Sequence, residues 1–231
     1  MVQHHNPLPP DYPPVTATTE LIDRKWLSQS AFEVEIDRPQ HFQFTPGHTI
    51  RLISGNQKRY YSLLSAVDDP TLRLCVNFIS TGGMASLLAA AEIGSSFKLT
   101  GPHGYFNLSP SPRPPVFIAT DTGVAPFVSM ARSGINGFTL LHGSGRVEEL
   151  YYSDLLRQAA ETYLPCLWGS VDDSGQSGPQ FHGKMVDLLT HHLKPGCYDF
   201  YLCGWQKMIA DVTCLIDDRY PGSHVYTEVF Y

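Results

Sequence analysis

The feature that most constrains the fold is a change of sequence pattern at a proline-rich stretch that runs from Ser109 to Pro115. Before this stretch, short β-rich runs follow one another with turn residues between them. After it, strand-like runs alternate with helical ones. Because proline neither continues a helix nor donates to a sheet ladder, we interpret residues 110–115 as a linker between two domains, and 231 residues are enough for two.

The first half predicts a small antiparallel β-barrel, because it contains many short strands at close spacing. Turn residues such as Pro46 and Gly47 separate the strands, and one segment in which Ala and Leu crowd together predicts a helix. The expected strands are 16–28, 31–35, 48–52, 58–66, 71–79 and 96–100, and the expected helix is 84–91. We assign residues 1–15 to a flexible leader and residues 16–109 to the barrel domain.

The second half predicts a doubly wound parallel sheet, because its strands alternate with helices. The expected strands are 115–119, 138–142, 164–168, 200–203 and 225–229, and the expected helices are 125–132, 150–161, 184–193 and 207–218. We assign residues 116–231 to this α/β domain.

Composition argues against several classes of function. The formal net charge is −6 and no Lys- or Arg-rich run occurs, so nucleic acid is not an expected partner. No apolar run approaches the roughly 20 residues of a membrane span, and the first residues lack the apolar core of a secretory signal. The five cysteines form no C-x-x-C pair, which favours a cytoplasmic location and argues against a plant-type iron–sulfur cluster in this chain.

The tetrad Arg59-Tyr60-Tyr61-Ser62 combines a cation, aromatic rings and a small hydroxyl within one expected strand. Since a strand alternates its faces, Arg59 and Tyr61 should point one way and Tyr60 and Ser62 the other. Such a set suits a ligand that joins phosphates to a flat heterocycle, such as a flavin nucleotide. The structural alternative is an ordinary tyrosine-rich strand with a solvated arginine.

A second phosphate-binding feature precedes the expected helix of the first half. The sequence Ser80-Thr81-Gly82-Gly83 would place free N–H groups and the positive end of the helix dipole toward a phosphate. The alternative is an ordinary N-cap. Paired with Arg59, whose guanidinium is a planar fork, the segment predicts a pyrophosphate clamp.

Three segments of the second half lie where a parallel sheet binds ligands. The turn 120–126 follows the first strand, and 203–208 ends the fourth strand and opens its helix. The chain then ends in the aromatic segment 226–231, which predicts docking against something flat, because termini usually fray unless they are docked. A structural turn, a buried cysteine and core aromatics are the respective alternatives.

These segments, in this order and spacing, resemble the ferredoxin–NADP reductase family of flavoproteins from about Thr16 to Tyr231. Arg59-x-Tyr61-Ser62 is similar to the FAD signature R-x-Y-S/T of that family. The resemblance implies that Arg59 holds the pyrophosphate, Tyr61 packs on the flavin and Ser62 lies near flavin N5. Gly83-Met84-Ala85-Ser86 resembles the helix start that receives the FAD phosphates, and residues 101–106 resemble the G-P-x-G-x-F segment that closes the barrel.

The second half continues the resemblance. Residues 122–126 are similar to the G-T-G-I-A-P nucleotide loop, but Asp121 stands where the first glycine is normal. Cys203-Gly204 and Met208 match a C-G-x-x-x-M segment associated with the nicotinamide. The ending 228–231 is similar to the C-terminal E-x-aromatic segment, whose aromatic ring covers the flavin.

The resemblance implies hydride transfer from NAD(P)H to FAD, followed by single-electron release to ferredoxin, flavodoxin or an iron–sulfur oxygenase component. Ser62 would orient flavin N5, Cys203 would position the nicotinamide, Glu228 would relay a proton or give polar support, and Tyr231 with Phe230 would gate stacking. The predicted cofactor-binding set is Arg59, Tyr60, Tyr61, Ser62, Val76, Gly82, Gly83, Met84, Ala85, Ser86, Thr122, Gly123, Arg146, Lys184, Cys203, Gly204, Met208, Phe230 and Tyr231.

The choice between NADH and NADPH rests on few residues. Arg146 and Lys184 are the candidate cations for a 2′-phosphate, whereas Asp172 and Asp173 would repel it and bind a free ribose diol. We expect NADH or dual use, and a monomer. Two alternatives stay open: a reductase of free flavin in the same superfamily, and a non-enzymatic regulatory subunit, which Asp121 would favour.

Overall fold

The computed structural model describes residues 12–78, 82–168 and 181–230. Most of the expected leader and the residues Ser80 and Thr81 therefore lie outside the described residues. Contacts between Cα atoms divide the described chain into two compact units. One consists of 12–108 with 125–135, and the other of 109–124 with 136–230.

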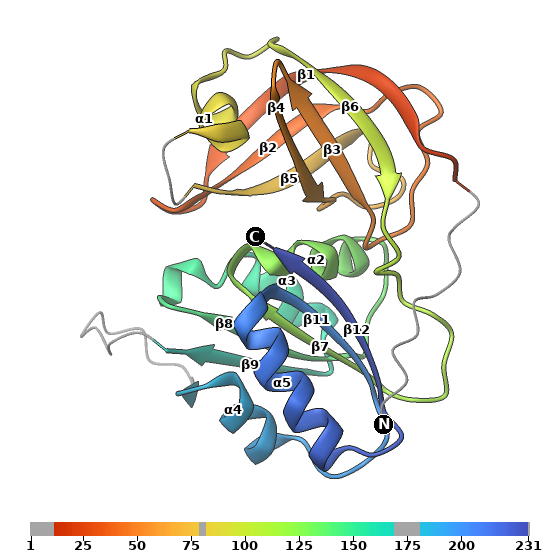
Figure 1. Cartoon of the computed structure of the whole chain (residues 1–231), viewed down its shortest axis with the longest axis vertical. Coiled ribbons are helices and arrows are strands. Elements are labelled where there is room, and N and C mark those ends of the chain that lie inside the picture. Colours follow the sequence, from red (N-terminus) through yellow and green to blue (C-terminus); the bar gives the residue numbers. More distant parts are fainter. Residues whose placement is uncertain (1–11, 79–81, 169–180, 231) are drawn as a thin grey trace. The chain divides into compact units, whose positions relative to one another are not determined.

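The first unit is built on an antiparallel sheet of six strands (Figure 1), in the order β4-β3-β6-β1-β2-β5. An isolated bridge between Leu63 and Leu74 joins its two ends and curls the sheet into a barrel. The strands are β1 (Val15–Trp26), β2 (Ala31–Asp37), β3 (Thr49–Ser54), β4 (Gln57–Ser62), β5 (Thr71–Asn77) and β6 (Ser96–His103). The expected barrel is confirmed.

The barrel core follows from alternation along the strands. In β2, Phe32, Val34 and Ile36 are fully buried, and the residues between them are less so. The helix α1 (Gly83–Ala90) adds Met84 and Leu88 to the same core. The expected strand 58–66 ends earlier, at Ser62, because the residues after it leave the β4 ladder and bond elsewhere.

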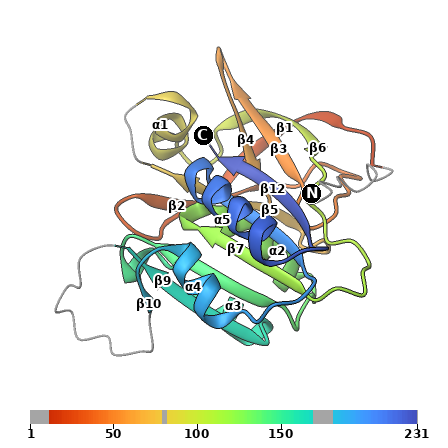
Figure 2. The same ribbon diagram turned by 60° about the horizontal axis from the view of Figure 1, so that its bottom comes forward.

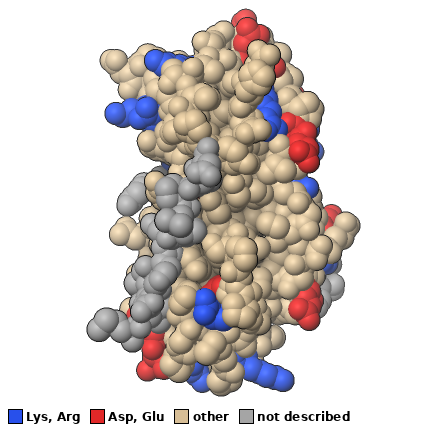
Figure 3. All heavy atoms as spheres, turned by 90° about the vertical axis from the view of Figure 1, so that its right-hand side faces the viewer, with Lys and Arg blue, Asp and Glu red and all other residues tan. Residues whose placement is uncertain are grey.

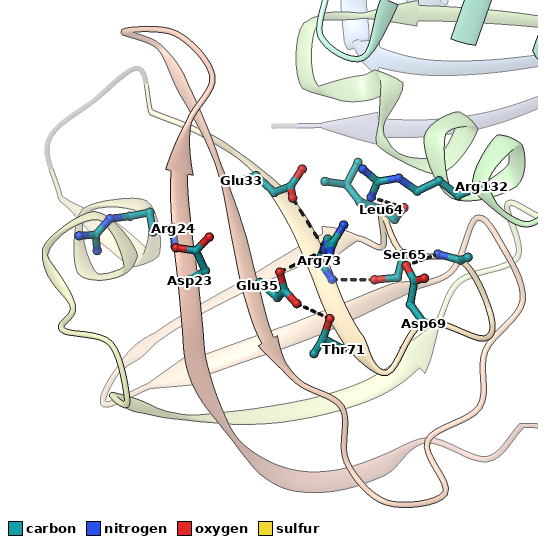
Figure 4. A network of polar contacts seen from close by, with 11 residues as sticks. Asp23, Arg24, Glu33, Glu35, Leu64, Ser65, Asp69, Thr71, Arg73 and Arg132 are labelled. Atoms are coloured by element: carbon teal, nitrogen blue, oxygen red, sulfur yellow. Dashed lines mark hydrogen bonds and ion pairs between the residues drawn. The ribbon is translucent and has the colours of Figure 1, made fainter. Parts of the chain in front are cut away.

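The helix α2 (Ala125–Arg132) belongs by its contacts to the barrel unit, although it follows the first strand of the second half. Ser129 Oγ donates to the carbonyl of Ser65 at 2.6 Å, and the Arg132 guanidinium donates to the carbonyl of Leu64 at 3.1 Å. Figure 4 shows Arg132 reaching Leu64 beside the network of Arg73 with Glu33 and Glu35. The predicted boundaries of the second domain, 116–231, include α2 because this non-local packing has no local sequence signal. These boundaries stay a prediction.

The second unit is a parallel sheet in the order β10-β9-β8-β7-β11-β12. Its strands are β7 (Pro115–Thr120), β8 (Thr139–Ser144), β9 (Thr162–Leu167), β10 (Phe181–His182), β11 (Asp199–Trp205) and β12 (His224–Phe230). The helices α4 (Met185–His192) and α5 (Gln206–Arg219) lie side by side over one face of the sheet (Figures 1 and 2). The core between the sheet and these helices contains four fully buried residues, Phe200 and Leu202 of β11 and Val212 and Ile216 of α5. The doubly wound parallel sheet is confirmed.

Some elements of this unit differ from expectation. The helix α3 (Ser153–Ala159) is shorter than the expected 150–161, because Tyr152 adopts a left-handed backbone with φ of 60° immediately before it. Short 3₁₀ turns precede α2 and α3 at η1 (Asp121–Val124) and η2 (Val147–Glu149). The two-residue strand β10 was not predicted.

An ion pair with a buried carboxylate fixes the start of the second unit. Asp199, 2% exposed at the start of β11, pairs with Arg113 Nε, and its Oδ1 lies 3.6 Å from Nδ1 of His224 on β12. Arg113 lies in the expected linker, so the pair ties that segment to the first residues of two strands.

Two surface properties bear on possible partners. None of the helices in the described part of the chain is long and apolar enough to cross a membrane. On the face drawn in Figure 3, the Lys and Arg side chains of the described residues lie in separate small groups among uncharged atoms. The described residues on that face do not form the continuous basic stripe that nucleic acid binding needs.

Candidate cofactor sites

The order of strands in the parallel sheet locates the candidate nucleotide site. From β7 the chain builds outward through β8, β9 and β10, then returns to add β11 on the other side of β7. The carboxyl ends of β7 and β11 are neighbours, with Cys203 paired to Ala119. A sheet of this type binds ligands at such a switch point. Thr122, Gly123, Cys203 and Gly204, all predicted site residues, lie at this point.

Two glycines let the nucleotide loop pack closely against β11. A Cβ atom on Gly123 would lie 2.5 Å from the carbonyl oxygen of Cys203 and 2.7 Å from Cα of Gly204. A Cβ on Gly204 would collide with Oγ1 of Thr120, and the φ of Gly204 is +134°. The two glycines therefore hold the loop against β11 at the edge of the sheet where a parallel sheet binds ligands.

Asp121, which replaces the usual glycine, has a left-handed φ of 50°, a conformation that Asp adopts more readily than most residues. Its carboxylate accepts a hydrogen bond from Ser144 Oγ at 3.2 Å, and Glu149 Oε2 lies 3.4 Å from the same hydroxyl. Burial raises the pKa of Asp121 to about 6; the Ser144 hydrogen bond lowers it and Glu149 raises it. The side chain turns toward β8, and an acidic pair stands at the ligand-binding edge.

A cavity of about 290 Å³ opens beside this edge, within the second unit. The rings of Trp168 and Trp205 line it, with centroids 5.0 Å apart, and the backbone N–H of Trp205 donates to Thr120 Oγ1 at 3.0 Å. Lys184, at the N-cap of α4, and Met208 also line the cavity. Two indole rings beside a lysine can hold a flat base and an anionic group.

The candidate cations differ in their surroundings. Arg146 is exposed and forms an ion pair with Glu148. Lys207, at the rim of the cavity, pairs with Asp211 at 2.9 Å. The predicted pair Asp172 and Asp173 lies outside the described residues. Lys184 is the predicted cation that lines the cavity itself.

Cys203 is fully buried in β11, where it lies opposite Glu228 of β12. Burial, with a smaller contribution from Glu228, raises the pKa of the Cys203 thiol well above its ordinary value. The residue is therefore a neutral thiol at physiological pH and cannot act as a thiolate nucleophile. A role in packing against a ring remains available to it.

The tetrad of β4 divides between surface and core. Arg59 is exposed, and Tyr60 is 52% exposed with the Arg51 guanidinium 5.7 Å from its ring centroid. Tyr61 is only 5% exposed and belongs to the barrel core. The expected alternation therefore holds for Tyr60 and Tyr61, and Tyr60 lies on the side of Arg51 rather than with Tyr61.

Tyr61 and Ser62 have properties that fit a bound cofactor. The Tyr61 hydroxyl is buried and has no hydrogen-bond partner among the described residues, a costly state that a ligand atom would relieve. Burial raises the pKa of Tyr61, and Arg59 lowers it by a smaller amount, so the hydroxyl is a neutral donor. Ser62 is 3% exposed at the end of the strand.

The start of α1 offers an open backbone surface. Gly82 and Gly83 have φ of 102° and 68°, and no atom lies within 4 Å of a Cβ built on Gly82. Ser86 Oγ accepts a hydrogen bond from Gly82 N at 2.6 Å, while Met84 and Ala85 point into the core. The first N–H groups of an α-helix lack intrahelical partners, so an exposed Arg59, the orphaned Tyr61 hydroxyl and this helix start fit the phosphates and ring of FAD.

The remaining predicted residues are placed as follows. Val76 is fully buried opposite Phe32 and offers no exposed surface to a cofactor. Phe230 ends β12, but its side chain is not described, and Tyr231 lies outside the described residues. Glu228 is half-buried in β12.

Sequence reasoning missed three contributors to the sites. The pairing of Trp168 with Trp205 was not predicted, although Trp205 lies within the segment 203–208. The hydrogen bond from Ser144 to Asp121 and the orphaned hydroxyl of Tyr61 depend on distances between separate strands and could not be read from spacing.

Comparison with known proteins gives the two units their classes. Residues 18–108 match the oxidoreductase FAD-binding domain, and residues 117–213 match the oxidoreductase NAD-binding domain. An FAD-binding barrel followed by an NAD-binding parallel sheet defines a flavin-dependent oxidoreductase. Ferredoxin–NADP reductase B of Sorangium cellulosum is 35% identical over 87% of this chain and 92% of its own length. The chain belongs to the ferredoxin–NADP reductase family, as its motifs predicted.

Two further comparisons show similar proteins. The 2-halobenzoate 1,2-dioxygenase electron transfer component of Burkholderia cepacia is 27% identical over 90% of this chain, which spans 65% of that relative. The crystal structure of a ferredoxin NADP+ reductase from Neisseria gonorrhoeae with bound FAD and NADP has the same fold, with a TM-score of 0.80 and 22% identity over 94% of this chain and 99% of that one.

Proposed function

We propose that this flavoenzyme oxidises NADH with its FAD and passes single electrons to a separate iron–sulfur or flavodoxin-type carrier. The observation that carries the proposal is the switch point between β7 and β11. There, Gly123 and Gly204 allow backbone packing that any Cβ would prevent, next to a cavity lined by two tryptophans. The barrel unit supplies the features that fit a flavin, namely the unpartnered hydroxyl of Tyr61 and the glycines at the start of α1.

In the barrel unit, Arg59 and the start of α1 would hold the FAD pyrophosphate. Arg59 is exposed on β4, and the first N–H groups of α1, which begins at Gly83, have no partners within the helix. The Tyr61 hydroxyl would donate a hydrogen bond to the cofactor. It would then no longer be a buried polar group without a partner. Ser62, the next residue, would place its hydroxyl at flavin N5.

In the second unit, Trp168 and Trp205 would hold the adenine-ribose part of the dinucleotide, with the loop of Thr122 and Gly123 on its pyrophosphate. The neutral Cys203 would pack against the nicotinamide, and Glu228 beside it would give polar support. Bound FAD would supply the hydride acceptor and the one-electron release. The chain itself would bind the FAD and the nicotinamide nucleotide, orient them and exclude water.

The preference for NADH follows from the charges at the nucleotide edge. Arg146 is paired with Glu148, and Asp121 lies with Glu149 at the carboxyl ends of β7 and β8. Like charges within a few ångströms repel a phosphate, so the 2′-phosphate of NADPH would lose affinity here. Lys184 lines the cavity and would partly offset this repulsion, whereas Lys207, which also lines it, is paired with Asp211.

The acceptor is inferred from relatives. The Sorangium cellulosum protein is named for ferredoxin, and the Burkholderia cepacia protein is an electron transfer component of a dioxygenase. The first name supports ferredoxin and the second supports an oxygenase component as the acceptor, and we propose flavodoxin as a further alternative. We further propose a monomer, which light scattering of the purified protein would check.

One spectroscopic experiment tests the proposal. The purified protein is examined for visible flavin absorption, then mixed without oxygen with NADH or NADPH, and finally with a one-electron dye. We expect a yellow protein whose flavin band bleaches faster with NADH and recovers with the dye. A colourless protein that reduces only added flavin would instead be a free-flavin reductase, and no reduction by either nucleotide would overturn the proposal.

A further inference from the structure

The helix α2 bonds to a short segment that directly follows the candidate flavin strand. Ser129 Oγ donates to Ser65 O at 2.6 Å, and Arg132 donates to Leu64 O at 3.1 Å. Ser133, just after the helix, accepts a hydrogen bond from Val67 N at 3.2 Å. Two carbonyls and one N–H within four residues are therefore fixed by α2 and the residue that follows it. Figure 4 shows the bond from Arg132 to Leu64.

The same segment is also bonded on its barrel side. Leu63 N donates to the carbonyl of His48 at 3.0 Å, and Leu64 N donates to the carbonyl of Arg73 at 2.8 Å. The Ser65 hydroxyl accepts from Arg73 N at 2.7 Å. The barrel and α2 together determine the backbone from Leu63 to Val67, so the position at which Ser62 leaves β4 is determined with it.

Ser129 is an unexpected residue for its position. It is fully buried, as are its neighbours Phe127, Val128 and Met130. Alanine would favour the helix more and would leave no hydroxyl to desolvate. The hydroxyl is compatible with this site because it bonds the Ser65 carbonyl, which would otherwise lack this donor.

The helix also begins where the nucleotide loop ends. Gly123 of that loop packs against β11, and α2 starts two residues later at Ala125. One continuous stretch of chain therefore carries both the nucleotide loop and the residue that bonds the segment after Ser62.

We propose that Ser129 is a positioning residue for the flavin: through Ser65 it sets the place of Tyr61 and Ser62, and so the placement of the flavin ring against them. The proposal rests on the proposed function, since it assigns Ser62 and Tyr61 to the flavin. Small errors of placement cost catalysis far more than they cost binding.

The test uses the full-length protein loaded with FAD. Ser129→Ala removes the hydroxyl, and Ser129→Thr restores one. Thr190→Ala on α4 is the matched control, because it removes a helical hydroxyl that bonds only Val186 O, one turn earlier, at 2.8 Å. The measurements are the visible flavin spectrum, the flavin midpoint potential, and the rate of flavin reduction at saturating NADH in rapid mixing.

With Ser129→Ala we expect a shifted flavin band and a saturating reduction rate lowered about tenfold, while KM for NADH changes less than about twofold. Ser129→Thr should recover most of the rate, and Thr190→Ala should match the wild type. If Ser129→Ala lowers thermal stability but leaves spectrum, potential and rate unchanged, Ser129 is only structural and the proposal fails.

Two further outcomes are separated by design. If Ser129→Ala does not fold, Ser129→Cys decides the question, because it keeps a side chain of similar size at this buried position but donates only weakly to the Ser65 carbonyl. An unchanged flavin spectrum and reduction rate in that variant would equally overturn the proposal. If the wild type neither holds FAD nor oxidises a nicotinamide nucleotide, the proposed function fails instead.

Discussion

Replacing Asp121 with asparagine should stabilise the protein at neutral and alkaline pH. Asparagine has nearly the same shape, tolerates the left-handed φ of 50° and can still accept the hydrogen bond from Ser144 Oγ. What the substitution removes is a carboxylate that is partly desolvated and lies near Glu149. The protonated form of Asp121 is the form that asparagine imitates.

The magnitude follows from linkage between protonation and folding. The pKa of Asp121 is raised from 3.8 to about 6 in the folded protein. Below the lower value both states are protonated and the carboxyl has no effect; between the two values only the unfolded chain loses its proton, so stability falls as pH rises. About two pKa units correspond to an upper value of about 3 kcal/mol above pH ~6, and partial solvent exposure reduces this to about 1–2 kcal/mol.

Urea unfolding of wild type and Asp121→Asn at about pH 5 and about pH 8 measures the effect. We expect the variant to gain about 1–2 kcal/mol at the higher pH, and about half of this at the lower one. Asp217→Asn, on the exposed side of α5, is the control for losing one negative charge. A gain of equal size at both pH values, or one matched by the control, would refute the reasoning.

Three further substitutions test other parts of the structure. Gly204→Ala should lower the free energy of unfolding by about 2 kcal/mol or more and abolish NADH binding in a fluorescence titration, because its φ is +134° and its Cβ would strike Thr120. Arg113→Met removes the arginine partner of the buried Asp199 and leaves His224 as its neighbour, so urea unfolding should show a loss of about 3 kcal/mol in the free energy of unfolding. Arg59→Ala, on the exposed end of β4, should weaken FAD binding about tenfold in a flavin titration and change stability by less than about 0.5 kcal/mol.

Much of the fold could be predicted from the sequence because periodicity reports burial. Phe32, Val34 and Ile36 alternate with less buried residues along β2, and this pattern requires no knowledge of the partner strand. The parallel strands β7 and β11 are buried throughout most of their length, as expected for a sheet with both faces covered. The family signatures then placed the flavin and nucleotide segments on these elements.

The remainder depends on contacts between distant residues. Neither the association of α2 with the barrel nor the bond from Ser129 to Ser65 leaves a local signal, because a serine in an apolar helix reads the same with or without its acceptor. The left-handed Tyr152, which delays the start of α3, is likewise set by its surroundings and not by propensity.

The departure at Asp121 shows that glycines in the nucleotide loop answer two separate requirements. At Gly123 and Gly204 the requirement is space, since an added Cβ would meet the backbone of β11 or the side chain of Thr120. At position 121 the backbone is left-handed with φ of 50°, which aspartate can adopt, and its side chain finds a partner in Ser144. Substitution is therefore tolerated where only handedness is needed. The carboxylate then adds a charge that the loop of a glycine-bearing relative would lack, which is why charge and not backbone geometry should dominate the effect of altering this residue.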